Sequence, residues 1–314
     1  MKRYVCLAFM AALMAGAAVS EAATALITEL KKGTGTIEIR RAGRDLWQPA
    51  LPLQGLEAGD SLRATGDGYA TVVYASGGKK VRVAAANSPL KIVEPRQQDA
   101  QAAKAQQVFR DITGFLAGKK TEQLSAPMAV RRLNRPLAII SPKNTRVLPG
   151  SRPVFEWMGP SRVYYRLRLV SSGTEVWSSG QVVRTRLAYP EDAPALRPGG
   201  SYSWEVETAD AAPVRAEFTV AGLEEKDALG RELSMIEPEQ GNAVSATAAV
   251  LRYGILARKG FYAEARNVLL SAAAADPDEP SLHILLAEYY RHVGLKDMAA
   301  EEEDEADFLL RKRP

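Results

Sequence analysis

Short runs of alternating apolar residues predict that residues 25–95 form a small all-β domain. Ile37 and Ile39 begin the pattern, and Val81 and Val83 repeat it further along the chain. Clusters of Gly, Asp and Asn separate the runs, and these residues favour turns because Gly adopts positive φ and Asp and Asn bond to nearby backbone. Each run therefore places one apolar strand face on a shared core.

Two acidic residues in this segment stand beside glycines. Asp60 and Asp67 could form an acid or metal pair, but Asp next to Gly is far more often a turn residue, and we expect that role here. Trp47 could cover the core or offer a platform to a ligand. We expect it to be buried, because large aromatic side chains mostly pack in cores.

The segment 97–135 is predicted to begin as an amphipathic helix and to end as a basic linker. Apolar residues recur at helical spacing as far as Leu116, and Gly118 ends the helix. We expect this helix to pack against a neighbouring domain. The linker could attract anionic lipids or cell-wall polymers, or simply face water, as runs of charge usually do. Its basic residues are Lys119, Lys120, Arg131, Arg132 and Arg135.

Residues 137–221 are predicted to form a β-sandwich. Seven short runs with strand character alternate with Gly and Pro turns, which is typical of that architecture. Trp157 and Trp204 are expected in the core between the sheets. Trp177 is harder to place, because it could pack in the same way or present a stacking platform to sugars.

The C-terminal segment 223–314 is predicted to be helical and contains an internal repeat. Gly260 and Gly294 lie 34 positions apart, and so do Ala265 and Ala299. Stacked helix pairs repeat with this period. Two copies are fewer than the about three that such stacks need, so we expect the helix before them to supply support.

The start of the chain resembles an export signal. Lys2 and Arg3 precede an apolar run and then small residues, so we expect residues 1–22 to be a signal peptide that is cleaved near Ala22. Cys6, the only cysteine, lies within it, and an exported chain without cysteine suits a bacterial periplasm. No later run reaches the roughly 18 apolar residues of a membrane helix, so we expect no transmembrane anchor.

The chain offers few residues for catalysis. His283 and His292 are nine positions apart on one predicted helix, so they fall on opposite faces and cannot share a metal. Ser76 and Lys79 match a short pattern of serine acyl-transfer enzymes without its companion motifs. We therefore assign no catalytic, metal or cofactor site and expect a protein that is not an enzyme. The net charge of +4 is too weak to favour nucleic acid as a partner.

Three stretches resemble known families. The order from Trp47 through GDSLRATGDGYATVVY to GGKKVRV and NSPLKI is similar to the FecR-type domain of bacterial envelope proteins. The run LRPGGSY, which ends at Tyr202, resembles fibronectin type III domains, and this implies that the Tyr202 hydroxyl bonds back to nearby backbone. The run KGFYAEA, which starts at Lys259, resembles tetratricopeptide repeats. The resemblances imply a multidomain chain with a FecR-like β domain, a fibronectin type III-like β-sandwich and tetratricopeptide-like helical hairpins.

These resemblances favour a non-enzymatic periplasmic binding or scaffold protein of the cell envelope. Membrane-bound FecR relatives take part in signalling to sigma-factor regulators; without a membrane helix, only the binding role is expected here. Stacked helix pairs form concave grooves for peptides or helices, so the expected partner is an envelope protein or peptide segment. Candidate groove residues are Tyr253, Leu256, Ala287 and Tyr290, which could equally pack between the helices.

The alternative hypothesis is a cell-wall polysaccharide or peptidoglycan binder with weak hydrolase activity. It would use Trp177 as a platform and Glu156 and Glu175 as a carboxylate pair, because a glycosidase needs two carboxyl groups across a cleft.

A further feature is the acidic run 301–307, which could dock a basic partner or form a solvated helix face.

Overall fold

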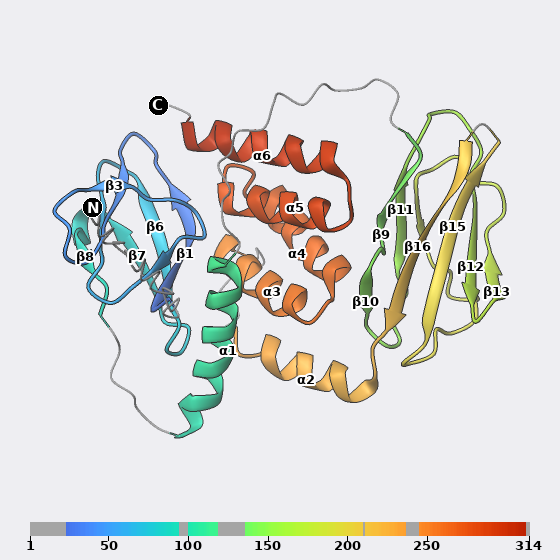
Figure 1. Ribbon diagram of the computed structural model, residues 1–314, viewed down its shortest axis with the longest axis horizontal. Helices are drawn as coiled ribbons and strands as arrows, with labels where there is room; N and C mark the ends of the chain where they lie inside the picture. The colour runs from blue at the N-terminus through green and yellow to red at the C-terminus, as the bar shows by residue number, and fades with distance from the viewer. Residues whose placement is uncertain (1–22, 94–99, 119–135, 210, 237–244, 312–314) are drawn as a thin grey trace, which may run out of the picture.

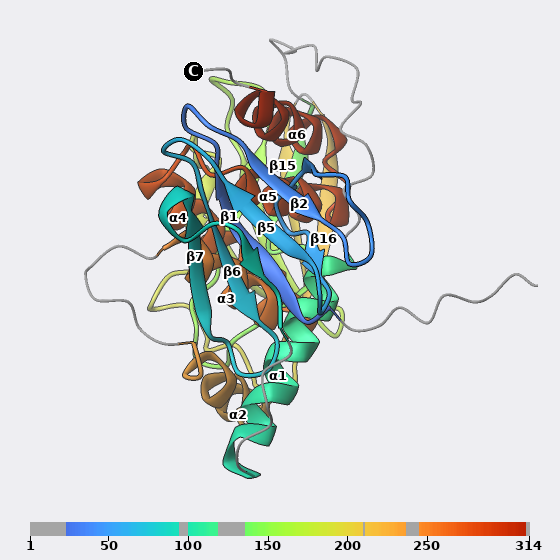
Figure 2. The same cartoon turned by 90° about the vertical axis from the view of Figure 1, so that its left-hand side faces the viewer.

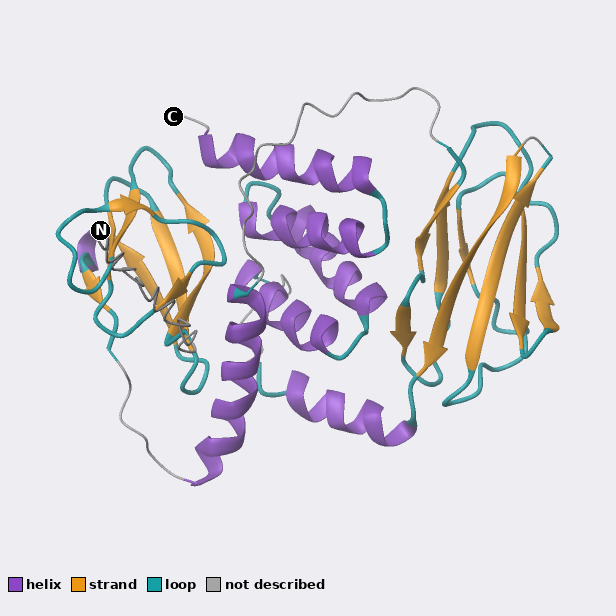
Figure 3. Cartoon of the chain, viewed as in Figure 1, coloured by secondary structure: helices purple, strands orange, loops and turns teal. Residues whose placement is uncertain are grey.

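Two β modules stand on either side of a layer of helices (Figure 1). Figure 3 shows the strands gathered in the two modules and the long helices between them. The computed structural model describes residues 23–93, 100–118, 136–209, 211–236 and 245–311. The predicted signal peptide lies outside the described residues. The same is true of the basic linker residues Lys119, Lys120, Arg131, Arg132 and Arg135.

The first β module consists of two four-stranded antiparallel sheets, in the orders β4-β1-β6-β7 and β3-β2-β5-β8. Ile37, Ile39 and Val72 are buried in its core as predicted. Alternation holds in β2, whereas β1 and β6 are buried on both faces, because Leu26 and Val73 on their other face pack against the helices. The strands are β1 (Ala25–Lys31), β2 (Ile37–Arg40), β3 (Gln48–Pro49), β4 (Gly55–Leu56), β5 (Ser61–Ala64), β6 (Tyr69–Tyr74), β7 (Lys80–Ala84) and β8 (Leu90–Lys91), with a short 3-10 helix η1 (Ala85–Asn87) before β8.

The two turn acids of this module hold loops in place. The buried Asp60 carboxylate accepts hydrogen bonds from the Arg41 guanidinium at 2.7 Å and from the backbone N–H of Glu57 at 2.9 Å. Asp67 accepts from both the backbone N–H and the hydroxyl of Thr34. These bonds are the turn role that the sequence predicts.

Trp47 does not occupy the core position that we expected, so that prediction is wrong. Its side chain is half-buried, and the guanidinium carbons of Arg40 and Arg63 lie 5.0 and 4.3 Å from its ring centroid. The ring therefore makes cation–π contacts with two guanidinium groups at the surface of the module.

The second β module is a sandwich of two sheets, in the orders β10-β16-β15-β12-β13 and β14-β11-β9. Trp157 and Trp204 are buried between the sheets as predicted, and the Tyr202 hydroxyl accepts a hydrogen bond from the backbone N–H of Arg197 at 2.7 Å. The strands are β9 (Ala138–Ser141), β10 (Thr145–Val147), β11 (Val154–Met158), β12 (Arg166–Ser171), β13 (Thr174–Ser178), β14 (Arg186–Ala188), β15 (Ser201–Thr208) and β16 (Ala211–Val220).

The helices confirm the 34-residue repeat in their spacing. The paired helices α3 and α4 begin at Ala246 and Tyr262, and α5 and α6 begin 34 positions later, at Pro280 and Lys296. Each pair turns at a glycine with positive φ, which a side chain would strain. The helices are α1 (Ala100–Ala117), α2 (Leu223–Leu233), α3 (Ala246–Arg258), α4 (Tyr262–Ala275), α5 (Pro280–His292) and α6 (Lys296–Arg311).

Helix α1 crosses α3 at a close contact. A Cβ atom at Gly254 would lie only 2.7 Å from Cγ2 of Ile112, so the absence of a side chain at Gly254 allows the two helices to approach. Ile112 and Leu116 are fully buried there. The predicted amphipathic helix therefore packs on the helical layer, as expected.

The first β module is fixed to the helices through strand β1. The side-chain oxygens of Thr28 and Thr247 lie 2.8 Å apart, and the Ser281 hydroxyl donates to the carbonyl oxygen of Thr28 at 2.8 Å. The backbone N–H of Leu30 donates to Glu279 of the layer. Figure 2 views this contact from the side of the module, with β1 in front of α3 and α5. One apolar core runs from the module into the helices.

The sandwich is fixed to the opposite side of the same layer. The Thr145 hydroxyl donates to the carbonyl oxygen of Gly260 at 3.1 Å, and the Tyr289 hydroxyl donates to the carbonyl oxygen of Ile140 at 2.8 Å. Arg266, which is buried, forms an ion pair of 2.6 Å with Glu156. The helical layer therefore connects the two β modules through polar contacts on both of its sides.

Candidate functional site

The residues expected to line a groove between the helices are buried. Tyr253, Leu256 and Tyr290 are 1%, 4% and 3% exposed, and Ala287 is also in the core. The same core includes Leu26 of the first β module, because the chain's own β modules and α1 cover the helices. In the described part of the chain these residues therefore line no open groove, and that prediction is wrong.

Trp177 is not a free platform for a sugar. Its half-buried ring stacks on Phe155 with centroids 6.5 Å apart, and it forms a T-shaped pair with Tyr189 whose centroids are 5.4 Å apart. These contacts attach the ring to the core of the sandwich. Packing, the other interpretation of Trp177, is the one that the structure shows.

The proposed carboxylate pair of the alternative hypothesis does not converge. Glu156 lies on β11, where it pairs with Arg266 at 2.6 Å and Arg186 at 2.8 Å. Glu175 is exposed on β13, which belongs to the other sheet. A hydrolase site built on these two residues is therefore contradicted.

The two histidines have separate partners, in agreement with their predicted opposite faces. Nδ1 of His283 lies 2.8 Å from the Glu302 carboxylate. His292 stacks on Tyr262 with centroids 3.8 Å apart, and its Nε2 lies 3.2 Å from the carbonyl oxygen of Asn144. Among the described residues, no three His, Cys, Asp or Glu side chains gather in a way that could hold a metal ion.

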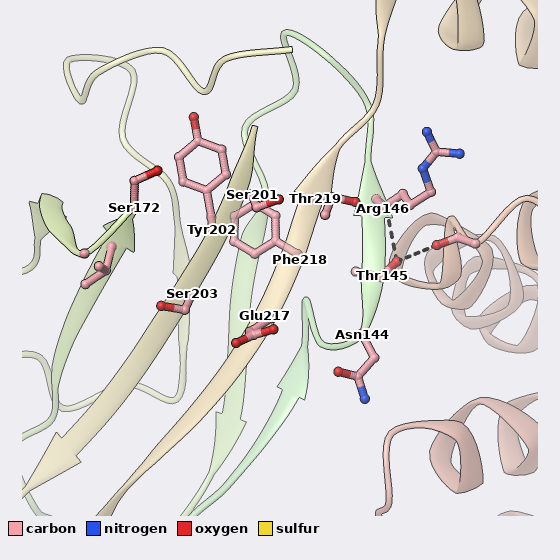
Figure 4. A pocket seen from close by; sticks show the side chains of 13 residues that line it. Asn144, Thr145, Arg146, Ser172, Ser201, Tyr202, Ser203, Glu217, Phe218 and Thr219 are labelled. Atoms are coloured by element: carbon pink, nitrogen blue, oxygen red, sulfur yellow. Dashed lines mark hydrogen bonds between the residues drawn. The ribbon is translucent and has the colours of Figure 1, made fainter. Parts of the chain in front are cut away.

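A polar hollow of about 510 Å³ lies on the five-stranded sheet, beside the helical layer (Figure 4). It extends from the β12–β13 turn across β15 and β16 to β10. Its lining includes Val170 and the side chains of Ser172, Ser201, Ser203, Glu217, Thr219, Asn144 and Arg146. We call it the sheet hollow.

The hollow exists because short side chains meet on neighbouring strands. Ser203 pairs with Val170 of β12 and with Glu217 of β16, and Ser201 pairs with Thr219. Further along the same strands, long charged side chains fill the surface. There Glu205 pairs with Arg168 at 3.6 Å and Arg215 at 3.3 Å, in register across three strands. This ion-paired ladder bounds the hollow at one end.

Glu217 is the chemically distinctive group of the sheet hollow. Its side chain is exposed, and in the described residues neither its carboxylate nor the hydroxyls of Ser203 and Thr219 contact a protein partner. Arg146, at the edge of the hollow, instead pairs with Glu225. The hollow therefore offers one free negative charge together with hydroxyl and amide groups that both donate and accept hydrogen bonds.

Each side of the helical layer also holds a buried carboxyl group. Burial raises the pKa of Glu279, at the contact with the first β module, to about 7. Burial likewise raises the pKa of Glu264, beside the sandwich, to about 7. Glu264 Oε2 is buried without a hydrogen-bond partner among the described residues, while Oε1 accepts from the backbone N–H of Leu148 at 3.4 Å. These acids are structural groups of the two contacts and lie outside the sheet hollow.

The alternation of Ser201 and Ser203 with Tyr202 and Trp204 signals which β15 residues point outward, but it does not reveal the hollow. Predicting the hollow would require the register of β12, β15 and β16, which sequence periodicity does not give. The edge strand β10 also escaped prediction, because three residues give no periodic pattern.

Among the described residues, no helix has the length and apolar character needed to cross a membrane. No protein-family model matches the chain. No curated protein matches it either. A solved structure of CopC from Methylosinus trichosporium OB3b is similar to part of it, with 22% identity over 28% of this chain and 95% of that chain, and a TM-score of 0.22. A likeness at this TM-score carries no argument about fold or ligand.

Proposed function

We propose that the chain is a non-enzymatic binding protein of the bacterial envelope, exported by the signal-like residues 1–22, and that it binds a polypeptide segment in the sheet hollow. FecR-like, fibronectin type III-like and tetratricopeptide-like parts are the finer classification that we propose for the first module, the sandwich and the paired helices. The helices in this proposal hold the two β modules in place, and the partner binds to the sandwich.

The unpaired Glu217 carboxylate is the observation that carries this proposal. A basic side chain of the partner would supply its missing charge, and charge-assisted hydrogen bonds are the stronger kind. The hydroxyls of Ser203 and Thr219 would bond to the peptide backbone, which presents N–H and C=O groups in alternation. A single carboxylate suits this recognition, whereas glycoside hydrolysis needs two.

Site-specific cross-linking tests the proposal. A photoreactive side chain at Ser203 of the exported protein should capture a polypeptide, and mass spectrometry should place a Lys or Arg at the captured segment. Glu217→Lys should reduce capture about tenfold through charge repulsion. Glu175→Lys is the matched control, because Glu175 is exposed on the same sheet outside the hollow. Equal capture by both variants would contradict the proposal.

A further inference from the structure

A second hollow, of about 770 Å³, lies at the other end of the same sheet, a size typical of ligand sites. Register places it there, because Arg166 at the start of β12 pairs with Glu207 near the end of β15. The ion-paired ladder separates it from the sheet hollow. Residues that line it and carry polar side-chain groups include Arg162, Tyr164, Arg166, Gln181, Glu207 and Thr208. We call it the loop-end hollow.

An aromatic ring is exposed at the loop-end hollow. Tyr164 is 62% exposed, whereas its neighbour Tyr165 is buried and donates a hydrogen bond to the carbonyl oxygen of Pro160. The backbone of Tyr165 also exchanges two hydrogen bonds with Val182, at 2.8 and 2.9 Å. These bonds fix the backbone directly after Tyr164, while the Tyr164 ring contacts no other ring in the described residues. Such a ring offers an apolar face with a polar tip to a ligand.

The charge of the loop-end hollow is positive. Arg162 and Arg166 are exposed, and neither has an acidic partner in the part of the chain that the structure describes. Among the described lining residues the one acidic side chain is that of Glu207, which lies 3.7 Å from Arg168 and is thereby compensated. Two free guanidinium groups near an exposed ring favour a ligand that carries a carboxylate, which they can bind in a bidentate manner.

One buried polar atom lacks a partner at this place. Thr208 lines the hollow, and its hydroxyl oxygen is buried without a hydrogen bond to any described residue. Buried hydroxyls are normally bonded, but this oxygen is covered by protein atoms, so it is not offered to a ligand in the hollow. The Gln181 amide adds a donor and an acceptor to the same lining.

We propose that the loop-end hollow binds an acidic saccharide. The apolar face of a pyranose ring packs on Tyr164, Arg162 and Arg166 bind its carboxylate, and the Gln181 amide bonds to its hydroxyl groups. This site does not include Trp177, whose ring packs against the core of the sandwich. It also shares no residue with the sheet hollow. Its test is therefore independent of the proposed polypeptide binding.

Two disaccharides that differ in one lactyl ether group, which carries a carboxylate, provide the probe. N-acetylglucosaminyl-N-acetylmuramic acid and N,N′-diacetylchitobiose are titrated separately into the full-length protein, and amide shifts are followed by NMR. The acidic disaccharide should bind about tenfold more tightly, because the charged contact is absent from the neutral one. The shifts should map to residues 162–166, 179–181 and 207–209. Equal affinities, shifts elsewhere, or no binding of the acidic sugar up to about 20 mM would overturn the proposal.

Matched variants assign the roles. Tyr164→Ala should weaken both sugars about tenfold, and Tyr164→Phe should retain binding because the ring remains. Arg166→Gln should remove most of the preference for the acidic sugar. Val183→Ala and Arg44→Gln are the controls, since both residues are exposed and neither lines the hollow. Controls that weaken binding as much as Tyr164→Ala would also overturn the proposal.

Discussion

Thr28 of β1 and Thr247 of α3 lie 219 positions apart in the sequence, yet their side-chain oxygens are 2.8 Å apart. Both residues are buried, at 0% and 2% exposure. Thr28 also donates to the carbonyl oxygen of Thr71 at 3.2 Å, so the contact joins two strands of the first β module to the helical layer.

Thr247→Val keeps the shape of this contact and removes its hydroxyl. We expect a loss of about 1 kcal/mol in the free energy of unfolding, the usual value of one buried hydrogen bond. Urea unfolding measures the loss. Thr174→Val, on the exposed edge strand β13, should change stability by less than about 0.5 kcal/mol. Equal effects of both substitutions would show that the Thr28 contact adds nothing.

The stability of the protein should fall as pH rises from about 4.5 to about 7. The pKa of Glu279 is raised from 4.5 to about 7 in the folded chain, so between these values the folded state binds more protons than the unfolded state. By linkage, that extra stability is fully present below the unfolded pKa and is lost as pH rises through the folded one. For this fully buried group the loss corresponds to about 3 kcal/mol.

Glu279→Gln replaces the titrating group by a neutral amide of the same shape. Unfolding measured at pH 5 and at pH 8 should show a smaller loss of stability in the variant than in the native chain. Glu264 and His283 retain their own raised pKa values, so a shallower slope should remain in this variant and become shallower still in the double Gln variant. An unchanged slope in Glu279→Gln would contradict the assignment.

The sequence predicts the local elements well because their signals are local. The 34-residue spacing of Gly260 and Gly294 corresponds to the two turns between paired helices. The alternation of apolar residues indicated strand faces that form the core of the first β module. The groove prediction failed for a physical reason. An apolar face on α3 or α5 must be covered, but periodicity does not tell whether a partner or the same chain covers it. Here Tyr253 and Tyr290 are covered by the chain itself.

One substitution should have opposite effects in two helices. Gly254→Ala places a Cβ 2.7 Å from Ile112 and should destabilise the chain by about 1–3 kcal/mol through overpacking. Gly230→Ala in α2 meets open space and should stabilise it by about 0.5–1 kcal/mol through helix propensity. Thermal unfolding of the two variants compares the signs. Stabilisation by Gly254→Ala would contradict the close contact of α1 with α3.

The Glu156–Arg266 pair should be important for stability, not for catalysis. Glu156→Ala leaves the Arg266 cation buried without its carboxylate and should cost about 2–4 kcal/mol. Glu175→Ala, at an exposed position, should cost less than about 0.5 kcal/mol. In the double variant Glu156→Leu/Arg266→Met most of the stability should return, because both charges are gone. A failure to recover would show that the loss does not come from the unpaired cation.

Contacts on both sides of the helical layer should hold the two β modules in one fixed arrangement, and a distance between the modules tests this claim. Spin labels at Arg44→Cys in the first module and Glu175→Cys in the sandwich, in a Cys6→Ser background, would be the only two labels because the chain has a single native cysteine. Double electron–electron resonance between them should give one narrow distance distribution. A broad or multi-peaked distribution would contradict the claim, because it would mean that the modules move independently.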